Sequence, residues 1–579
     1  MHKSGALRTV SSRHEEGVSA GAASGTPRAR LSAVLITKNE ERQIERCLAS
    51  LAWVDEIVVV DDESADRTRD LCRKAGATVL RRPSRGDFNQ QRNAGMDAAH
   101  GEWILQLDAD EVVSPALREE ICGVLQRSSD VVAYRVRRQN AFLGRQMQYG
   151  GWGWNGVKLF RKSAARYVGH SVHETLTVDG PVAQLTQPIQ HYPFTSLTQF
   201  IERQNFYSDV EARLLRQSRP VVTETALRYQ LLMRPLKLFW KSYVKQAGYR
   251  EGLLGLIFAA LFAWMYFLKW AKWWEVGCSR AELPGADLRM ERTPVRAAGR
   301  LAGAAPARET LSVVVLTKNE EARIGRCLVS VQWADELIVV DGESQDRTSE
   351  IARAFGAVVI AHAFDGSFAT DRNLGMSHAH GDWVLQIDAD DVVTPEFRTA
   401  AEAMLRERPS HAAYKFRRRS VLLGRVMRDG GWYYAVPNLL RRGRAHYEGL
   451  VHERPSVEGT TGELNADIEH HPCEDLSTFV KRHNRYTSLQ AEELLRTRGA
   501  MPRRRLWRLL WRMPWKTFWK SYVKKAGYRE GLHGLVFAEL YAGFELLKWA
   551  KYWELSRQGR AHPDPASDRA SGSELLVDR

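Results

Sequence analysis

The amino-acid sequence predicts an α/β protein in which two tandem copies each form a mainly parallel, doubly wound sheet. Two observations lead to this fold class: a long internal repeat, and short β-branched segments that alternate with helical patterns inside each copy. The length of 579 residues agrees with it, because a single core rarely grows beyond about 250–300 residues. We therefore expect several cores.

The repeat joins two segments of closely similar sequence. LSAVLITKNEERQIERCLASL begins at Leu31 and LSVVVLTKNEEARIGRCLVSV begins at Leu311, an offset of 280 residues. The offset becomes 279 after one deletion, where FWKSYVKQAGYREGL from Phe239 matches FWKSYVKKAGYREGL from Phe518. Solenoid repeats have periods of about 20–50 residues, so this longer period indicates that a complete domain was duplicated and fused.

The repeat also sets the expected domain boundaries. The segments outside it are rich in Ala, Gly, Pro, Ser and Arg and lack apolar periodicity, so we expect them to be disordered tethers. The predicted order is a tail at 1–30, a first domain at 31–278, a linker at 279–309, a second domain at 310–556 and a tail at 557–579. Each domain ends in an aromatic and basic helical segment, about 235–276 and 514–555.

Polar clusters follow the predicted strands of the first copy. SAVLIT, EIVVVD, ATVLRR and WILQLD are predicted strands, and EERQIERCLASL and QQRNAGMDAAH are predicted helices. The clusters are Thr37–Glu40, Asp61–Ser64 and Asp108–Asp110. Ligands of open α/β sheets bind at the carboxyl ends of the strands, so we expect the three clusters to meet in one crevice.

The motif Asp-x-Asp occurs once in each copy, at Asp108/Asp110 and at Asp388/Asp390. Two carboxylates with this spacing at a strand end can hold Mg²⁺ or Mn²⁺, which would also take oxygens from a substrate diphosphate. The motif alone is weak evidence because turns use Asp freely. Its place after a buried strand in both copies strengthens the metal interpretation.

With these motifs, each copy resembles an inverting family 2 glycosyltransferase with a GT-A fold, and is most similar to the branch that includes lipopolysaccharide core β-glucosyltransferases. The resemblance rests on LITKNEE, VVVDDESADRT, FNQQRN and LDADE in copy one, and on LTKNEE, VVDGESQDRT, FATDRN and IDADD in copy two. It covers nearly all of both repeats. It implies two GT-A-type, Rossmann-like domains in tandem, with a nucleotide-sugar donor, UDP-hexose, and a divalent cation.

The resemblance further implies roles for residues at matching positions. The positions near the base, the ribose and the donor sugar are Thr37, Asn39, Glu40, Asp61, Asp66, Arg92, Asn93 and Asp108 in copy one, and Thr317, Asn319, Glu320, Asp341, Asp346, Arg372, Asn373 and Asp388 in copy two. Asp110 and Asp390 would hold the metal. Copy two has Gly342 where copy one has Asp62, which affects one expected nucleotide contact.

An inverting enzyme needs a general base that takes the proton of the acceptor hydroxyl. His173-Glu174 and His452-Glu453 lie about sixty residues beyond the metal motif of their copies. Their pairing suggests His as a third metal ligand or diphosphate contact and Glu as the base. The alternatives are a structural His with a surface Glu, and Asp110, Glu111 or Asp391 as rival bases. 

Other recurrent residues are compatible with two interpretations. Gly150-Gly151-Trp152 and Gly430-Gly431-Trp432 suit a loop that receives the acceptor sugar, because aromatic rings pack on sugar faces, and equally suit a turn with a core Trp. His191 and His470 also recur, each two residues before a Pro, and we expect them to pack in the core.

The segments that end the copies raise the question of a membrane. Leu253 to Leu268 is an apolar run of 16 residues, just short of the 18 or so that indicate a spanning helix. The equivalent run contains His533, Glu539 and Glu545, which argues against spanning there. Trp, Tyr and Lys around such runs are typical of helices in the membrane interface. We expect peripheral attachment; deeper insertion in copy one and a core helix are the alternatives.

Composition narrows the class of function. The net charge of +15 points to acidic partners, but no basic stripe is joined to a nucleic-acid recognition motif, so we expect no nucleic acid. Scattered Cys residues and the absence of an N-terminal apolar stretch favour the cytoplasm.

The favoured hypothesis is that each copy transfers glucose or galactose to a lipid-linked saccharide, such as the lipopolysaccharide core, at the anionic inner face of the cell membrane. The alternative is that one copy is a non-catalytic module that binds glycan or membrane. Loss of a metal carboxylate would indicate such a module, and neither copy shows that loss.

Overall fold

The computed structural model describes residues 30–84, 87–169, 175–277, 308–365, 367–449, 454–472 and 474–561. The predicted tail 1–30 and linker 279–309 lie almost entirely outside the described residues. The second predicted tail overlaps a helix, because α15 (Leu532–Ala561) continues past residue 556.

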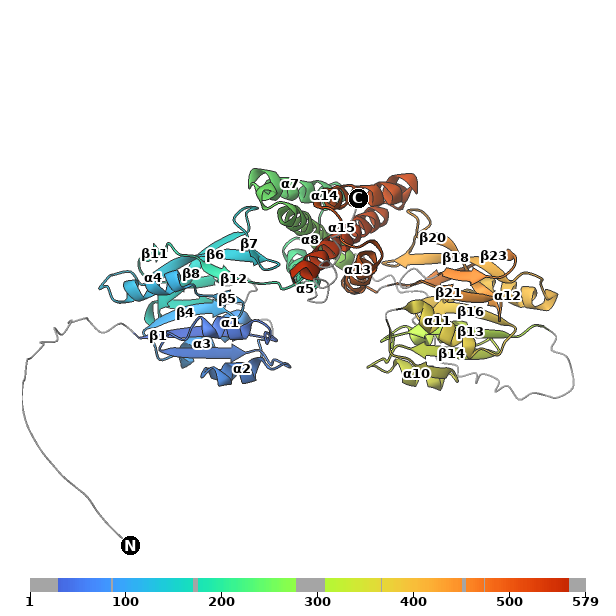
Figure 1. Cartoon of the computed structure of the whole chain (residues 1–579), viewed down its shortest axis with the longest axis horizontal. Helices are drawn as coiled ribbons and strands as arrows, with labels where there is room; N and C mark the ends of the chain where they lie inside the picture. The colour runs from blue at the N-terminus through green and yellow to red at the C-terminus, as the bar shows by residue number, and fades with distance from the viewer. Residues whose placement is uncertain are drawn as a thin grey trace, which may run out of the picture. The chain divides into compact units, whose positions relative to one another are not determined.

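The described chain forms two compact units (Figure 1). The first consists of the residues up to Ala141 together with Gly153–Pro193, and the second consists of Phe142–Trp152 together with everything from Phe194 onward. The terminal helices of the first repeat therefore belong to the same compact unit as the second repeat. The boundaries of the two duplicated domains stay a prediction from the repeat.

The first unit is an α/β sheet with the strand order β3-β2-β1-β4-β8-β6-β12-β5. Its strands are β1 (Leu31–Thr37), β2 (Glu56–Asp61), β3 (Thr78–Arg81), β4 (Trp103–Asp108), β5 (Glu111–Val112), β6 (Ala133–Phe142), β8 (Gly153–Arg161), β11 (Val182–Gln184) and β12 (Ile189–His191). Its helices are α1 (Ile44–Ala49), α2 (Thr68–Lys74), α3 (Phe88–Ala98) and α4 (Pro115–Leu125).

The second unit contains a sheet of the same order, β15-β14-β13-β16-β20-β18-β23-β17. Its strands are β13 (Leu311–Thr317), β14 (Glu336–Asp341), β15 (Val358–Ala361), β16 (Trp383–Asp388), β17 (Asp391–Val393), β18 (Ala413–Leu422), β19 (Arg425–Val426), β20 (Tyr433–Arg441) and β23 (Thr461–His470). Its helices are α9 (Ile324–Ser330), α10 (Thr348–Ala354), α11 (Phe368–Ser377) and α12 (Pro395–Glu407).

The α/β prediction is confirmed in both copies, with an addition. Strands β1 to β4 pair in parallel, as predicted, and β1 is buried along almost its whole length, as expected for a strand covered on both faces. The added strand β8 runs antiparallel to β4 and β6. A two-stranded ribbon also accompanies each sheet: β9 (Ala165–Val168) with β10 (Thr175–Val178), and β21 (Ala445–Glu448) with β22 (Arg454–Val457).

The terminal helices of both repeats build one bundle within the second unit (Figure 1). Its helices are α5 (Leu197–Ser218), α6 (Glu224–Arg228), α7 (Arg234–Trp240), α8 (Leu253–Gly277), α13 (Leu476–Arg498), α14 (Arg503–Trp519) and α15. The buried apolar side chains of α5, α8, α13 and α15 form one continuous core. This core buries the apolar surface that each repeat carries at its end.

A close approach between α8 and α15 fixes how these two helices pack. The buried indole of Trp264 on α8 lies against Gly543 on α15, where an added Cβ would overlap the ring. The same indole meets the ring of Phe544 edge to face, at a centroid distance of 5.5 Å. Gly543 is therefore needed for the approach, although glycine lowers helix propensity.

Each long helix also caps a helix of the other repeat. Glu275 near the end of α8 accepts a hydrogen bond of 2.7 Å from the backbone N–H of Leu476, the first residue of α13. Glu554 on α15 accepts one of 3.0 Å from the N–H of Leu197, the first residue of α5. Helix N-termini leave N–H groups without partners, and each of these hydrogen bonds satisfies one of them and so stabilises the bundle.

The burial of Leu253–Leu268 distinguishes between the three alternatives for this run: a helix in the membrane interface, an inserted helix and a core helix. Among the described helices, α8 alone is long and apolar enough to cross a membrane, and 78% of its apolar stretch is buried inside the protein. Its neighbours are α5, α7 and α15. The structure favours the interpretation of α8 as a core helix.

The packing of α8 on α15 predicts that Gly543→Ala destabilises the second unit. Overpacking of a filled core costs about 1–3 kcal/mol, so the midpoint of thermal unfolding should fall. The matched control is Gly325→Ala in α9, where an added Cβ meets no atom within 4 Å, and which should leave the midpoint unchanged or raise it. Calorimetry of the full chain measures both; equal midpoints for the two variants would contradict the close approach.

The cap between the repeats predicts a pH dependence. Burial raises the pKa of Glu275 from 4.5 to about 7. A carboxyl with a raised folded pKa contributes its full stability below the unfolded value and loses it as pH rises through the folded value, here between about 4.5 and 7. Gln keeps the acceptor oxygen without the charge. Glu275→Gln should therefore raise the thermal midpoint at pH 8 by roughly 2–4 °C, the effect of about 1 kcal/mol, and should match wild type near pH 4.5.

The control for Glu275→Gln is Glu350→Gln, which removes an exposed carboxylate of α10 and should give no gain at pH 8. A midpoint of Glu275→Gln below that of wild type at pH 8 would show that the charge of Glu275 stabilises the bundle.

Candidate active site

The three predicted polar clusters lie side by side at one edge of each sheet. In the parallel register, Thr37 pairs with Asp61 and Ile36 with Asp108, and the second copy repeats this with Thr317, Asp341 and Asp388. The ends of β1, β2 and β4 therefore bring these residues together, as the strand pattern predicted.

Asn39 and Asn319 hold the first two loops of the site together. Each has a φ of 54°, a left-handed conformation that Asn tolerates well. The backbone N–H of Asn39 donates to Ser64 Oγ at 2.9 Å, and its Oδ1 accepts from the N–H of Ala65 at 2.8 Å. Asn319 makes the same two contacts in copy two. The side chain of this residue shapes the loops of the predicted nucleotide site.

Asp61 of the second cluster and Asp66, which follows this cluster, accept hydrogen bonds from backbone N–H groups close to the site, as do their counterparts in copy two. Buried Asp61 accepts from the N–H of Ser64 at 3.0 Å, and Asp341 accepts from Ser344 in the same way, at 3.1 Å. Asp66 receives the N–H groups of Glu41 and Thr68, as its counterpart Asp346 receives those of Glu321 and Thr348. Burial raises the pKa of Asp66 and Asp346, but the Thr hydroxyl and these N–H groups outweigh it and lower the pKa.

The replacement of Asp62 by Gly342 has a local structural counterpart. Asp62 accepts from Ser84 N–H at 2.6 Å and from Lys38 Nζ at 3.1 Å, and so ties the loop after β3 to the loop after β1. In copy two, the side chain of Lys318 lies where the side chain of Asp62 begins in copy one: a Cβ added to Gly342 would be 3.2 Å from it. The difference therefore concerns loop anchoring in addition to the nucleotide contact expected there.

In copy one, the first carboxylate of the Asp-x-Asp motif lies among cations. Asp108 accepts from Arg92 at 2.9 Å and from Arg138 at 2.7 Å, and Lys158 Nζ lies 3.5 Å away. Burial opposes the charge of Asp108, yet Lys158, Arg92 and Arg138 hold its pKa well below its usual range. Fully buried Glu111 accepts from Arg138 Nε and from Lys158 Nζ, both at 2.7 Å.

Copy two has the same cluster with two differences: its third acid is shorter, and strand β20 lacks the cation that β8 supplies in copy one. Asp388 accepts from Arg372 at 2.8 Å and from Arg418 at 2.7 Å. Despite burial, these two cations lower the pKa of Asp388 to about 2. Asp391 stands where copy one has Glu111, and Asn438 where copy one has Lys158. The shorter acid and the absence of the lysine thus occur together in copy two.

Two histidines that we expected in the core contact the second carboxylate of the motif. His191 Nε2 lies 3.4 Å from Asp110 Oδ2, and His470 Nδ1 lies 3.3 Å from Asp390 Oδ1. Both histidines are largely buried, as expected, but they also belong to the site. They reach it because β12 and β23 pair with β5 and β17, the strands that follow the motifs.

Arg482 is a further site residue that the sequence did not identify. From α13 it donates to Asp390 Oδ2 and to Glu320 Oε1, both at 2.7 Å. It therefore joins the metal motif to the cluster after β13. Burial opposes the charge of Asp390, but His470 and Arg482 hold the pKa of this carboxyl well below its usual range. The signal in the sequence was the recurrence of Arg at 203 and 482 in both repeats.

A divalent cation fits the second copy. One ligand atom each from Asp390, Asp391 and His470 lie within 4.8 Å of one another, and in the described part of the chain no other group of three such residues meets this spacing. Two carboxylate oxygens and an imidazole nitrogen are suitable ligands for Mn²⁺. 

Arg92 and Asn93 of α3 act beside the cluster, as do Arg372 and Asn373 of α11. Asn93 clamps the backbone of Tyr167 with two hydrogen bonds of 2.9 and 3.1 Å, and Asn373 clamps Tyr447 likewise. The guanidinium of Arg92 binds Asp108 and lies 5.6 Å from the ring centre of Tyr167. In the structure, Asn93 and Asn373 position the ribbons β9–β10 and β21–β22.

His173, Glu174, His452 and Glu453 lie outside the described residues. In the sequence they fall between the two strands of each ribbon, immediately before Thr175 and Arg454.

The Gly-Gly-Trp loops favour the interpretation as turns with core tryptophans. Gly150 and Gly151 have φ values of 93° and 73°, which favour glycine. Trp152 stacks on Phe258 at a centroid distance of 5.0 Å. Trp432 is buried and lies 4.7 Å from the ring of Phe537. Both indoles are thus occupied by the helical bundle.

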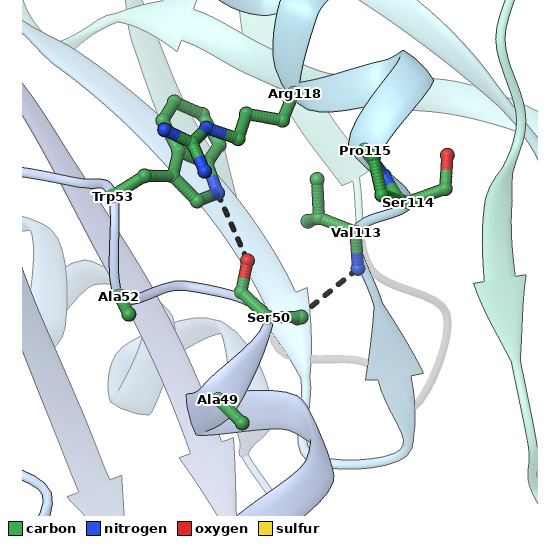
Figure 2. A pocket seen from close by; sticks show the side chains of 8 residues that line it. All are labelled: Ala49, Ser50, Ala52, Trp53, Val113, Ser114, Pro115 and Arg118. Carbon is green, nitrogen blue, oxygen red and sulfur yellow. Dashed lines mark hydrogen bonds between the residues drawn. The ribbon is translucent and has the colours of Figure 1, made fainter.

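A hollow of about 290 Å³ lies at the end of α1 in the first copy (Figure 2). In it, Trp53 Nε1 donates to Ser50 O at 2.9 Å, and Ser50 Oγ accepts from the N–H of Val113 at 3.1 Å. Trp333, Ser330 and Val393 repeat these contacts in copy two. None of the Asp-x-Asp carboxylates lines the hollow, so we assign it to the packing of α1 on the start of α4.

Comparison with known proteins identifies the family. The family described as "Glycosyl transferase family 2" matches residues 32–174 and 312–452, one stretch in each copy. The lipopolysaccharide core biosynthesis glycosyltransferase LpsC of Rhizobium meliloti is 30% identical over 275 residues, which cover 45% of this chain and 97% of that protein. An uncharacterized glycosyltransferase of Rickettsia typhi is 26% identical over 272 residues, 45% of this chain and 91% of that protein.

One solved structure that is similar to this chain is TarS of S. aureus in complex with UDP. The two are 16% identical with a TM-score of 0.23, and the match covers 43% of this chain and 90% of that one. Another is glucosyl-3-phosphoglycerate synthase of Mycobacterium tuberculosis, at 20% identity and a TM-score of 0.23, covering 32% and 80%. The family match in both copies and the similarity to LpsC over almost its whole length show the family. The chain belongs to glycosyl transferase family 2 and is a glycosyltransferase with tandem GT-A domains.

Proposed function

We propose that each copy transfers a hexose from UDP-glucose or UDP-galactose to a lipid-linked saccharide such as the lipopolysaccharide core, at the inner face of the cell membrane. The observation that carries the proposal is the buried cluster of carboxylates at the end of β4 and the start of β5, and at the end of β16 and the start of β17, held by cations in both copies. The similarity to LpsC, named for lipopolysaccharide core biosynthesis, supports the acceptor class.

In this proposal the residues have distinct roles. The acceptor oxygen attacks C1 of the hexose, the bond from C1 to the diphosphate oxygen breaks, and the nucleoside diphosphate leaves with the electron pair, so an α-linked donor gives a β-linked product. Asp390, Asp391 and His470 would hold a divalent cation, which when bound stabilises negative charge on the diphosphate. Arg372 and Arg418 keep Asp388 ionised beside the donor.

We assign the general base to Glu174 and Glu453. Glu111 and Asp391 are less suitable, because Arg138 and Arg418 donate to them at 2.7 and 2.8 Å and so occupy carboxylate oxygens that a base needs for the proton of the acceptor. Asp110 is also unsuitable: burial raises its pKa, but His191 outweighs it and the net pKa is lowered. A base must accept a proton, which a carboxylate held by cations does poorly.

One observation favours the alternative in which copy one is a non-catalytic module. In copy one, Lys158 contacts Glu111 at 2.7 Å, whereas copy two has Asn438 there. This ammonium adds a positive charge close to the metal motif. If it excludes the cation, copy one would bind glycan or membrane without catalysis.

The first prediction from the proposed function tests the activity of each copy separately. Asp110→Asn and Asp390→Asn should each abolish one transfer product and leave the other. A metal contributes several kcal/mol to the transition state, so we expect a loss of about 100-fold or more. The measurement is transfer from a panel of nucleotide-sugars to extracted lipopolysaccharide with Mn²⁺.

The matched controls for these variants are Asp70→Asn and Glu350→Gln, which remove exposed carboxylates of the same copies and should leave both products. If only Asp390→Asn lowers transfer, copy one is a docking module. If no donor reacts with the wild-type chain, the proposed activity is wrong.

The second prediction from the proposed function concerns the pair Glu111 and Lys158, which copy two replaces by Asp391 and Asn438. In the Asp390→Asn background, where only copy one would contribute, Lys158→Asn leaves Glu111 with one cation fewer and should lower transfer about tenfold, the lower range for loss of a supporting partner. Adding Glu111→Asp recreates the arrangement of copy two and should restore most of the rate. A double variant as impaired as the single one would show that the two positions are not coupled.

A further inference from the structure

The surface formed by α7 and α14, including the π-helical segment Tyr229–Met233 before α7, carries an unusual set of exposed side chains. Six of the 18 tryptophans of the chain are exposed, and five of these six lie on α7 and α14. With their apolar neighbours they form the α7–α14 face, whose members are Tyr229, Met233, Leu236, Trp240, Trp507, Trp511, Trp515 and Trp519, between 38 and 56% exposed. Exposed apolar patches of this kind mark interaction sites.

The tryptophans of α14 form a stripe. Trp507, Trp511, Trp515 and Trp519 follow one another at intervals of four residues, which drift by only about 40° per step around a helix. The opposite side of α14 is buried through Leu506 and Leu510. The helix therefore packs on the bundle with one side and presents its tryptophans on the other.

The two helices form one continuous surface. The ring of Phe239 on α7 lies 5.7 Å from that of Trp511 on α14, and both helices run along the same side of the bundle within the second unit (Figure 1). Trp240 and Trp519 are equivalent positions of the repeat. The duplication thus places similar aromatic groups on both halves of the face.

The charge around the face has a single sign. Residues 503–525 contain nine Lys and Arg and no acid, and residues 234–245 contain four and no acid. All thirteen basic side chains are exposed, and none forms an ion pair with a carboxylate in the part of the chain that the structure describes. An aromatic stripe flanked by unpaired basic groups suits a partner that is apolar inside and anionic outside.

We infer that the α7–α14 face docks on a bilayer that carries anionic headgroups, with both helices lying flat in the interface. Tryptophans then enter the headgroup and acyl boundary, while Lys and Arg bind lipid phosphates. Leu236 and Met233 favour a lipid over a nucleic acid, because aliphatic side chains gain from burial among acyl chains but offer no ring for stacking bases. Helix α8, which is buried, takes no part.

The inference rests on the proposed function only for the kind of acceptor, and it names the surface that brings the enzyme to that acceptor. The sequence pointed to the whole of 235–276 and 514–555 as the attachment. The structure places buried α8 and most of buried α15 in these segments, together with exposed α7, whereas most of exposed α14 lies just before the second segment. The membrane partner is therefore assigned to the helices that precede the long apolar ones.

The test is flotation of the full chain with vesicles of phosphatidylcholine, with and without phosphatidylglycerol. Wild type should bind the anionic vesicles at least about tenfold more tightly than the neutral ones, and added salt should weaken this binding. The double variant Trp515→Ser, Trp519→Ser should lose at least about tenfold in binding, because both rings are exposed and enter the interface.

The control is Phe206→Ser with Leu214→Ser, which removes two exposed apolar side chains of α5 outside the face and should bind like wild type. Equal binding of the tryptophan variant and wild type would overturn the inference, as would wild-type chain that binds duplex DNA but not anionic vesicles. Donor hydrolysis should be unchanged in the tryptophan variant. Vesicle binding without any donor turnover in wild type would refute the proposed function and leave the docking surface intact.

Discussion

The packing of α8 against α15 is the constraint on which the second compact unit depends. Each repeat ends in a long helix with many apolar side chains, and such side chains must be covered by protein or by lipid. Trp264 fits against Gly543, and the acidic residues Glu275 and Glu554 cap a helix of the other repeat. The two repeats thereby complete one shared bundle.

This bundle reaches the candidate site of the second copy through α13. The helix begins at Leu476, which Glu275 of the first repeat caps, and six residues later it carries Arg482. Arg482 binds both Asp390 and Glu320. The first repeat therefore supports a helix that holds the metal motif of the second. Fusion of the copies provides this support permanently, because the partner helices belong to one chain.

Charge balance explains the rest of the site. Three carboxylates close together under burial would repel one another and lose their charge unless cations surround them. Arginines from other strands and helices supply this balance in both copies, for example Arg138 and Arg418. The copies differ in how they reach it: Glu111 with Lys158 in one, Asp391 with Asn438 in the other. That difference is the strongest physical reason to test the two sites separately.

Much of this organisation could be predicted from the sequence. The repeat and the β-branched runs gave the strands β1 to β4, because buried parallel strands have continuous apolar sequences. His191 and Arg482 were not identified as site residues, because they reach the motif through strand pairing and helix packing, over 81 and 92 positions of sequence. The apolar run of α8 fits a membrane helix or a core helix equally well, and only the helices that cover it, α5, α7 and α15, distinguish them. The sequence left two roles open for Trp152, and only its stacking on Phe258 in the helical bundle shows that it is a core residue.

The most direct test of the account measures the binding of Mn²⁺ to the full chain with and without UDP. Electron paramagnetic resonance detects the Mn²⁺ that remains free in solution. The account predicts UDP-dependent binding of one ion per copy, with Asp110→Asn and Asp390→Asn each removing one. Binding of a single ion, lost only in Asp390→Asn, would restrict catalysis to the second copy. No UDP-dependent binding of Mn²⁺ would contradict the assignment of the carboxylate clusters as nucleotide-sugar sites.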